Sequence, residues 1–221
     1  ASHFKQEPVL KICVFDESEP WDGARGMWGF PQMRSHWKYN HFEKVYHVAV
    51  MTNCDKVLLY QNSQTVRYGY RSDEDDGMVH FYLPYITGVL RAEGYIGPMK
   101  VAEDILYSDH TADNLTVTVD RETLPADGRS VAMIDLVIND KHGRRFMLED
   151  KQVTVKAEGA PVEIRMDNGN AWEEAPFLRT ACPTYNGHLM ILVKAGCTPG
   201  EVTLTLDVED FGTREIKLTL A

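Results

Sequence analysis

Carboxylates are the residues of this chain whose chemistry is easiest to judge from spacing. Hydrolysis of a glycosidic bond needs two of them on rigid elements, about 5–9 Å apart. Glu173 and Glu174 are adjacent in a polar loop, where neighbouring side chains diverge, so we interpret them as solvated. The acidic run at residues 73–76 offers oxygen ligands for calcium but lacks the spaced acids and the glycine of an EF-hand loop. Neither group predicts a catalytic pair or a metal site.

Histidines and cysteines give no stronger signal. The histidines lack HExxH spacing, and the sequence has no GxSxG elbow and no glycine-rich phosphate loop. The cysteines lack CxxC spacing, and we favour buried free thiols for Cys13, Cys54, Cys182 and Cys197. Because Cys182 and Cys197 flank an expected strand pair, a disulfide between them stays open. We expect no catalysis by this chain alone, no catalytic residue, no cofactor and no metal.

Aromatic residues are the one group with a binding hypothesis. An exposed ring stacks on the flat apolar side of a sugar, which makes four tryptophans candidate carbohydrate-binding residues: Trp21, Trp28, Trp37 and Trp172. The alternative is that these rings pack in the core or against a neighbouring domain. We favour packing for the first three, because Met27, Pro31 and Met33 are interspersed with them. For Trp172, packing at the edge of a core is likewise favoured over ligand contact.

Composition narrows the function classes. The chain has 221 residues, 43% of them hydrophobic and 25% charged, which is typical of globular proteins and long enough for two domains of about 100 residues. Its formal net charge is -10, which disfavours binding to a phosphate backbone, so we expect no nucleic-acid partner. No apolar run approaches the roughly 20 residues of a membrane span. The start lacks the features of a signal peptide, and we expect it to be a cut in a longer protein.

Hydrophobic and polar residues alternate with a period of two along most of the chain, which predicts strands. The alternation is cleanest at residues 44–52, where Tyr46, Val48 and Val50 face one side. Further strands are expected at 9–15, 56–61, 65–70, 78–83, 88–94, 100–107, 115–119, 131–139, 153–157, 162–166, 188–194, 201–208 and 214–220. A polar stretch at 108–113 separates two series of strands. The sequence predicts an all-β protein with two consecutive immunoglobulin-like β-sandwich domains, residues 1–110 and 111–221.

Several short motifs occur in an order that is typical of a known family. They are SHWKY at 35–39, MTNCDKVLLYQN at 51–62, YITGVLRAEG at 85–94, ADG at 126–128, DNGN at 167–170 and AGCTPG at 195–200. In this order they resemble the C-terminal region of bacterial glycoside hydrolase family 2 enzymes of the β-galactosidase type. The chain departs from that pattern at residues 60–63, which read YQNS in place of FLNG, and residues 1–34 match no motif.

The resemblance implies a non-catalytic accessory or scaffold region of a glycosidase that acts in carbohydrate breakdown. It implies that residues 1–110 are the β-sandwich that follows the catalytic barrel and that 111–221 are a C-terminal immunoglobulin-like domain. The partner would be the missing barrel, which holds the catalytic glutamates of the family, and the location would be periplasmic or extracellular. We further expect residues 21–42 to pack on that barrel and to promote self-association when it is absent. Two alternatives remain: a carbohydrate-binding module that uses the tryptophans to hold an oligosaccharide, and an immunoglobulin-like pair that binds a protein. A homo-oligomer also stays open.

Overall fold

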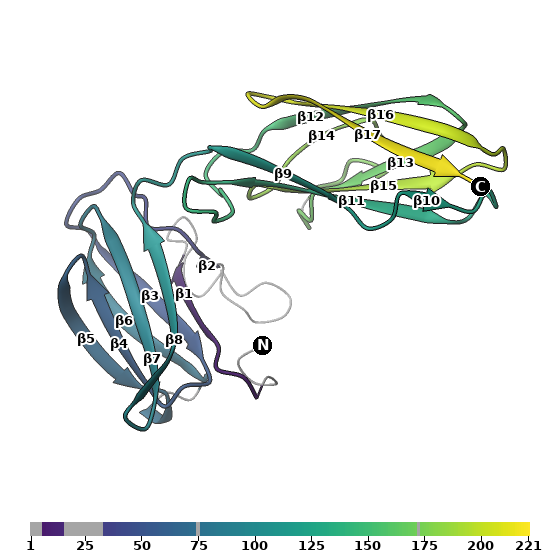
Figure 1. Cartoon of the computed structure of the whole chain (residues 1–221). Coiled ribbons are helices and arrows are strands. Elements are labelled where there is room, and N and C mark those ends of the chain that lie inside the picture. Colours follow the sequence, from purple (N-terminus) through teal and green to yellow (C-terminus); the bar gives the residue numbers. More distant parts are fainter. Residues whose placement is uncertain (1–5, 16–32, 74–75, 172) are drawn as a thin grey trace. The chain divides into compact units, whose positions relative to one another are not determined.

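The computed structural model describes residues 6–15, 33–73, 76–171 and 173–221. The chain forms two compact units, Ala1–His110 and Thr111–Ala221 (Figure 1). The described residues contain no α-helix, and their single helical element is a 3-10 turn at Arg71–Asp73. The all-β sandwich fold predicted from the alternating pattern is confirmed.

The described residues of the first unit form two four-stranded sheets. One has the order β2-β1-β3-β6 and consists of Met33–Arg34, Leu10–Phe15, Val45–Thr52 and Met78–Pro84. The other has the order β5-β4-β7-β8 and consists of Gln64–Tyr70, Lys56–Gln61, Val89–Ile96 and Met99–Tyr107. Every strand pair in both sheets is antiparallel.

Alternate residues of these strands form the core of the first unit. In β3 and β4, for example, Val48, Val50, Val57 and Leu59 are fully buried. Strands with one buried face present their remaining side chains on the outside of the sheet, because successive residues point to opposite faces. The outer faces of the two sheets are therefore defined by the same alternation that predicts the strands.

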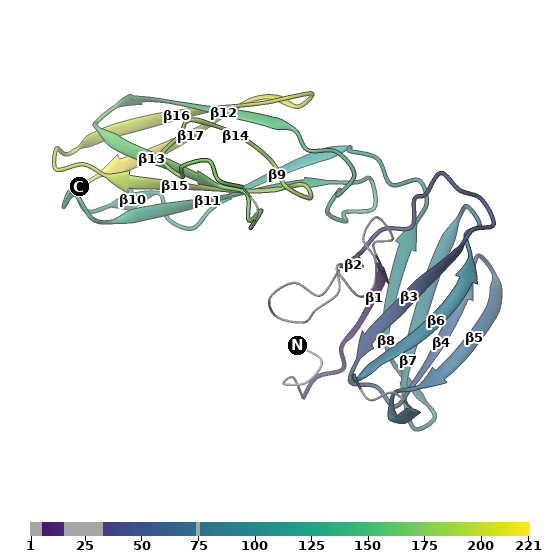
Figure 2. The same cartoon turned by 180° about the vertical axis from the view of Figure 1, so that it is seen from behind.

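The second unit also contains two sheets, of five and four strands. The larger has the order β10-β17-β16-β12-β14 and consists of Thr123–Leu124, Gly212–Leu220, Gly200–Val208, Gln152–Gly159 and Ala181–Pro183. The smaller has the order β13-β15-β11-β9 and consists of Val162–Asp167, His188–Ala195, Val131–Asn139 and Asn114–Val119. Figures 1 and 2 show them from opposite sides as two layers. The buried residues of β11, β15 and β16 fill the space between the layers.

The expected strands are present, with ends that differ by one or two residues, and three short ones were missed. These are β2, β10 and β14, of two or three residues each. A segment of this length is too short to display a period of two, so its pairing depends on the neighbouring strand.

Candidate functional site: the cleft between two sheet edges of the second unit

The candidate site lies where β12 and β13 carry the chain from one sheet of the second unit to the other. A tight turn through Gly159 joins them, and the backbone of Gly159 has a φ of +104°. A Cβ atom on Gly159 would lie 2.1 Å from the carbonyl oxygen of Glu201, so only glycine fits here. The turn is held by a hydrogen bond of 2.8 Å from the amide of Ala160 to the same carbonyl. This geometry places β12 and β13 along the same margin of the sandwich.

The cleft opens because β14 covers only the first part of β12. It pairs with Gln152, Val153 and Thr154 and with no later residue of that strand. Residues 177–180 then cross between the sheets: the amide of Met166 donates to the carbonyl of Phe177, and that of Val155 to the carbonyl of Thr180, each at 2.8 Å. One irregular segment thus hydrogen-bonds to both sheet edges and forms one side of the cleft.

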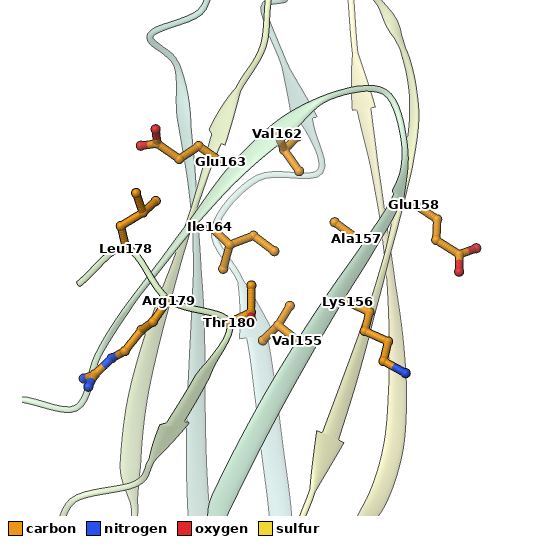
Figure 3. A pocket seen from close by; sticks show the side chains of 10 residues that line it. All are labelled: Val155, Lys156, Ala157, Glu158, Val162, Glu163, Ile164, Leu178, Arg179 and Thr180. Atoms are coloured by element: carbon orange, nitrogen blue, oxygen red, sulfur yellow. The ribbon is translucent and has the colours of Figure 1, made fainter. Parts of the chain in front are cut away.

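An apolar floor and a charged rim line the cleft (Figure 3). The side chains of Val155, Val162 and Ile164 form the floor. In Figure 3 the charged groups of Lys156, Glu158, Glu163 and Arg179 point away from its centre. The side chain of Leu178 is 59% exposed, although it is large and apolar. The cleft offers an apolar contact surface surrounded by charges of both signs.

A second pocket adjoins the cleft and shares Arg179 with it. The guanidinium donates to Glu173 at 2.6 Å and to the carbonyl of Met166 at 3.3 Å. The amide nitrogen of Asn168, which is buried, donates to the other oxygen of Glu173 at 2.8 Å and to the carbonyl of Pro183 at 3.1 Å. These bonds fix the loop that follows β13, and they occupy both oxygens of Glu173.

One carboxylate in each pocket, that of Glu163 in the cleft and that of Glu173 in the second pocket, is held in its ionised form. The hydrogen bond from Arg179 lowers the pKa of Glu173, and the hydrogen bond from Arg165 lowers that of Glu163. A general acid near neutral pH requires a raised pKa, so neither residue is suited to donate a proton. Burial raises the pKa of the Cys182 thiol to about 11, which leaves it protonated and unreactive. Glu163 and Glu173 can therefore contribute charge and hydrogen-bond acceptors to a ligand contact.

The structure describes one of the four tryptophans that the sequence makes candidates for carbohydrate binding. Trp37 is fully buried, its indole nitrogen donates to the carbonyl of Ile86 at 3.1 Å, and a ring that solvent does not reach cannot stack on a sugar. Its candidate role in carbohydrate binding is therefore replaced by the packing role. Trp21, Trp28 and Trp172 lie outside the described residues, so their role in binding stays a prediction.

The other candidate residues are also placed. All four cysteines are free, and Cys197 is exposed, so the expectation of buried thiols is wrong for that residue. Of the acidic run, residues 74 and 75 lie outside the described part, and Asp76 accepts hydrogen bonds from the amide of Met78 and the ring of His80. Within the described residues, no group of three or more His, Cys, Asp or Glu residues is arranged to hold a metal ion. In that part of the chain no helix is long and apolar enough to cross a membrane.

Comparison with known proteins gives a consistent result for both units. Residues 115–217 match the model of glycoside hydrolase family 2 C-terminal domain 5, and residues 43–102 match a domain of unknown function (DUF4982). A β-glucuronidase of Formosa agariphila is 26% identical over 91% of this chain, which covers 21% of that protein. A β-galactosidase of Bacteroides ovatus is 22% identical over 83% of this chain, which covers 22% of that protein.

A solved structure supports the same fold. It is a glycosyl hydrolase family 2 member from Bacteroides cellulosilyticus, with a TM-score of 0.85 and 24% identity over 100% of this chain. This chain covers 29% of that structure and about a fifth of the length of the curated relatives.

Proposed function

We propose that this chain, which is similar to the C-terminal region of glycoside hydrolase family 2 proteins, is a non-catalytic accessory region of a longer glycosidase of the β-galactosidase type. The observation that carries the proposal is length: this chain accounts for 21% and 22% of the two curated relatives. Most of each relative therefore lies outside the part that is similar to this chain. The catalytic barrel of such a protein is the proposed partner, and the proposed location is periplasmic or extracellular.

The proposed division of labour follows the two units. Residues 1–110 form the β-sandwich next to the barrel, and residues 111–221 form the C-terminal immunoglobulin-like domain. Both supply rigid sheets and contact surfaces that brace the barrel or shape the rim of its active site. The lowered pKa values of Glu163 in the cleft and Glu173 in the second pocket support this role, because a general acid near neutral pH needs a raised pKa.

Hydrolysis assays on the purified chain test this proposal. The substrates are 4-nitrophenyl β-galactoside and 4-nitrophenyl β-glucuronide, and we expect no release of nitrophenol above the rate in buffer. The matched variant is Glu173→Gln, which removes a carboxylate of the second pocket whose two oxygens both accept hydrogen bonds. Saturable hydrolysis by the wild type that this variant abolishes would overturn the proposal, because it would place a catalytic carboxylate in this chain.

A further inference from the structure

The outer face of the β5-β4-β7-β8 sheet carries an ordered row of tyrosines and lysines. Tyr70 pairs with Lys56, Lys56 with Tyr95, and Tyr95 with Lys100, so the four residues lie opposite one another on four successive strands. Residues in register across antiparallel strands point to the same face. Neighbouring strands are about 4.8 Å apart, so the row extends for roughly 14 Å. We call this surface, with Tyr60 and Tyr68 of the adjoining rows, the tyrosine face.

Two rings of the tyrosine face are open to solvent beside a cation. Tyr68 is 64% exposed and Tyr70 is 42% exposed, and their ring centroids are 6.0 Å apart in an edge-on arrangement. The ammonium of Lys56 lies 5.2 Å and 5.8 Å from the two centroids. In the described part of the chain, no carboxylate forms an ion pair with Lys56. The charge of this lysine is available to a ligand.

A buried carboxylate fixes the other half of the row. One oxygen of Glu93 accepts hydrogen bonds from the hydroxyls of Tyr60 at 3.0 Å and Tyr95 at 2.9 Å. The other accepts from the ammonium of Lys100 at 2.8 Å and from the guanidinium of Arg91. Burial alone would raise the pKa of Glu93, but these donors and the charge of Arg91 lower it to about 2. Side chains held in this way lose little further entropy when a ligand binds.

We propose that the tyrosine face binds an oligosaccharide that carries carboxylate groups. The sugar rings lie on Tyr68, Tyr70 and Tyr95, because an aromatic ring matches the apolar side of a pyranose and a tyrosine adds a hydroxyl for hydrogen bonding. A carboxylate of the ligand pairs with the ammonium of Lys56. The alternation of ring and cation along the row suits a polymer in which rings and charges also repeat.

The same residues argue against other occupants. The centre of a protein–protein interface is depleted of lysine and glutamate, whereas this face contains Lys56, Glu93, Lys100 and Glu103 close together. A nucleic acid strand also combines rings with charge, but it would meet a chain with a net charge of -10. A short acidic oligosaccharide contacts only this face, where the ammonium of Lys56 lies beside two exposed rings.

This inference goes beyond the accessory role and does not depend on it. A chain that hydrolyses a glycoside could still bind a sugar at the tyrosine face, and a purely accessory chain could lack such binding. Failure of one proposal therefore leaves the other in place. The two are measured separately, as hydrolysis and as equilibrium binding.

The test is calorimetric titration of the whole chain with oligogalacturonates of three to six units and with neutral galacto-oligosaccharides of the same lengths. We expect saturable binding of the acidic series and affinity that falls as salt is added. Tyr68→Ala and Tyr70→Ala should each raise the Kd about tenfold. Lys56→Gln should raise the Kd for the acidic series about fivefold.

Tyr82→Ala is the matched control, because Tyr82 is 55% exposed but lies on the outer face of the opposite sheet. It should leave the Kd unchanged, and thermal unfolding should show that every variant is folded. Equal affinity for the neutral series, or no effect of Lys56→Gln, would overturn the carboxylate contact. Absence of saturation at millimolar ligand, or dimerisation through this face in light scattering that Tyr68→Ala abolishes, would overturn the proposal as a whole.

Discussion

Two groups of aromatic residues in the described part of the first unit differ in what surrounds them. Trp37, Tyr46 and Tyr85 are buried, with ring centroids 5.2–6.2 Å apart and edge-on geometry in all three pairs. The tyrosine face has its rings on the outer side of a sheet, next to charged groups. Both groups follow from strand alternation, yet one contributes to the core and the other is accessible to a ligand. The type of an aromatic residue is therefore less informative than the face of the strand that carries it.

The largest expected effect comes from breaking the buried group. Trp37→Ala removes a fully buried side chain and leaves a cavity, which should lower the free energy of unfolding by about 3–5 kcal/mol. Urea unfolding followed by circular dichroism measures this. Trp37→Phe is the control and should recover part of the loss. A loss below about 1 kcal/mol for the alanine variant would mean that the ring is not part of the core.

Much of this contrast is predictable from sequence, but the row on the tyrosine face is not. The alternation in β4 indicates that Lys56 and Tyr60 share a face. The strand expected at 88–94 ends before Tyr95, so the shared face of Glu93 and Tyr95 is evident only from β7, which extends to Ile96. What the sequence does not reveal is that β4 and β7 are neighbours, because three elements of the chain intervene between them. Which residues lie opposite one another depends on strand order and register, and these are set by packing of the whole sandwich.

The cleft of the second unit is likewise only partly predictable from the sequence. Glycine at position 159 is consistent with a turn, and that turn is visible in the sequence. The path of residues 177–180 along two sheet edges is fixed by backbone hydrogen bonds that the amides of Val155 and Met166 donate to its carbonyls, and no side-chain pattern encodes these bonds. The sequence makes the tryptophans candidates for sugar binding by residue type alone. It does not show which of them are buried, and Trp37 is a core residue.

A second prediction concerns the carboxylate that orders the tyrosine face. Glu93→Gln removes the negative charge that accepts bonds from Arg91 and Lys100, which leaves both cations without that partner. The free energy of unfolding should fall by about 1–3 kcal/mol. Glu103→Gln is the control: this carboxylate is more exposed, and its loss should cost less than about 1 kcal/mol. Equal losses for the two variants would contradict a special role for Glu93.

The pH dependence of stability separates the site around Glu93 from the partly buried histidine His47 on the opposite sheet. His47 stacks between Phe15 and Tyr82, with centroids 3.8 Å and 4.4 Å away, and its Nε2 lies 2.8 Å from Nδ1 of His80. Burial, followed by the nearby His80, lowers the pKa of His47 from 6.5 to about 4, although Asp76 opposes the shift. The unfolded chain therefore binds a proton before the folded chain does.

The contribution of His47 to stability is accordingly complete above pH 6.5 and is lost as the pH falls from 6.5 to about 4. The contribution of Glu93, whose pKa is lowered from 4.5 to about 2, is lost only as the pH falls below 4.5. Urea titrations at pH 7, 5.5, 4.5 and 3 should resolve the two ranges. His47→Phe should flatten the upper range and leave the lower one intact. An unchanged upper range in this variant would assign the titration to another group.

The smallest expected effect on stability comes from a substitution on the exposed tyrosine face. Tyr68→Ala removes a ring that is 64% exposed on β5, the edge strand of its sheet, and should change the free energy of unfolding by about 0.5 kcal/mol or less. Thermal and urea unfolding measure it alongside Trp37→Ala. The two substitutions remove similar aromatic surface, so a large difference between them reflects position alone. A loss at Tyr68 near that at Trp37 would mean that the outer ring is needed for folding, and would remove the reason to regard it as free for a ligand.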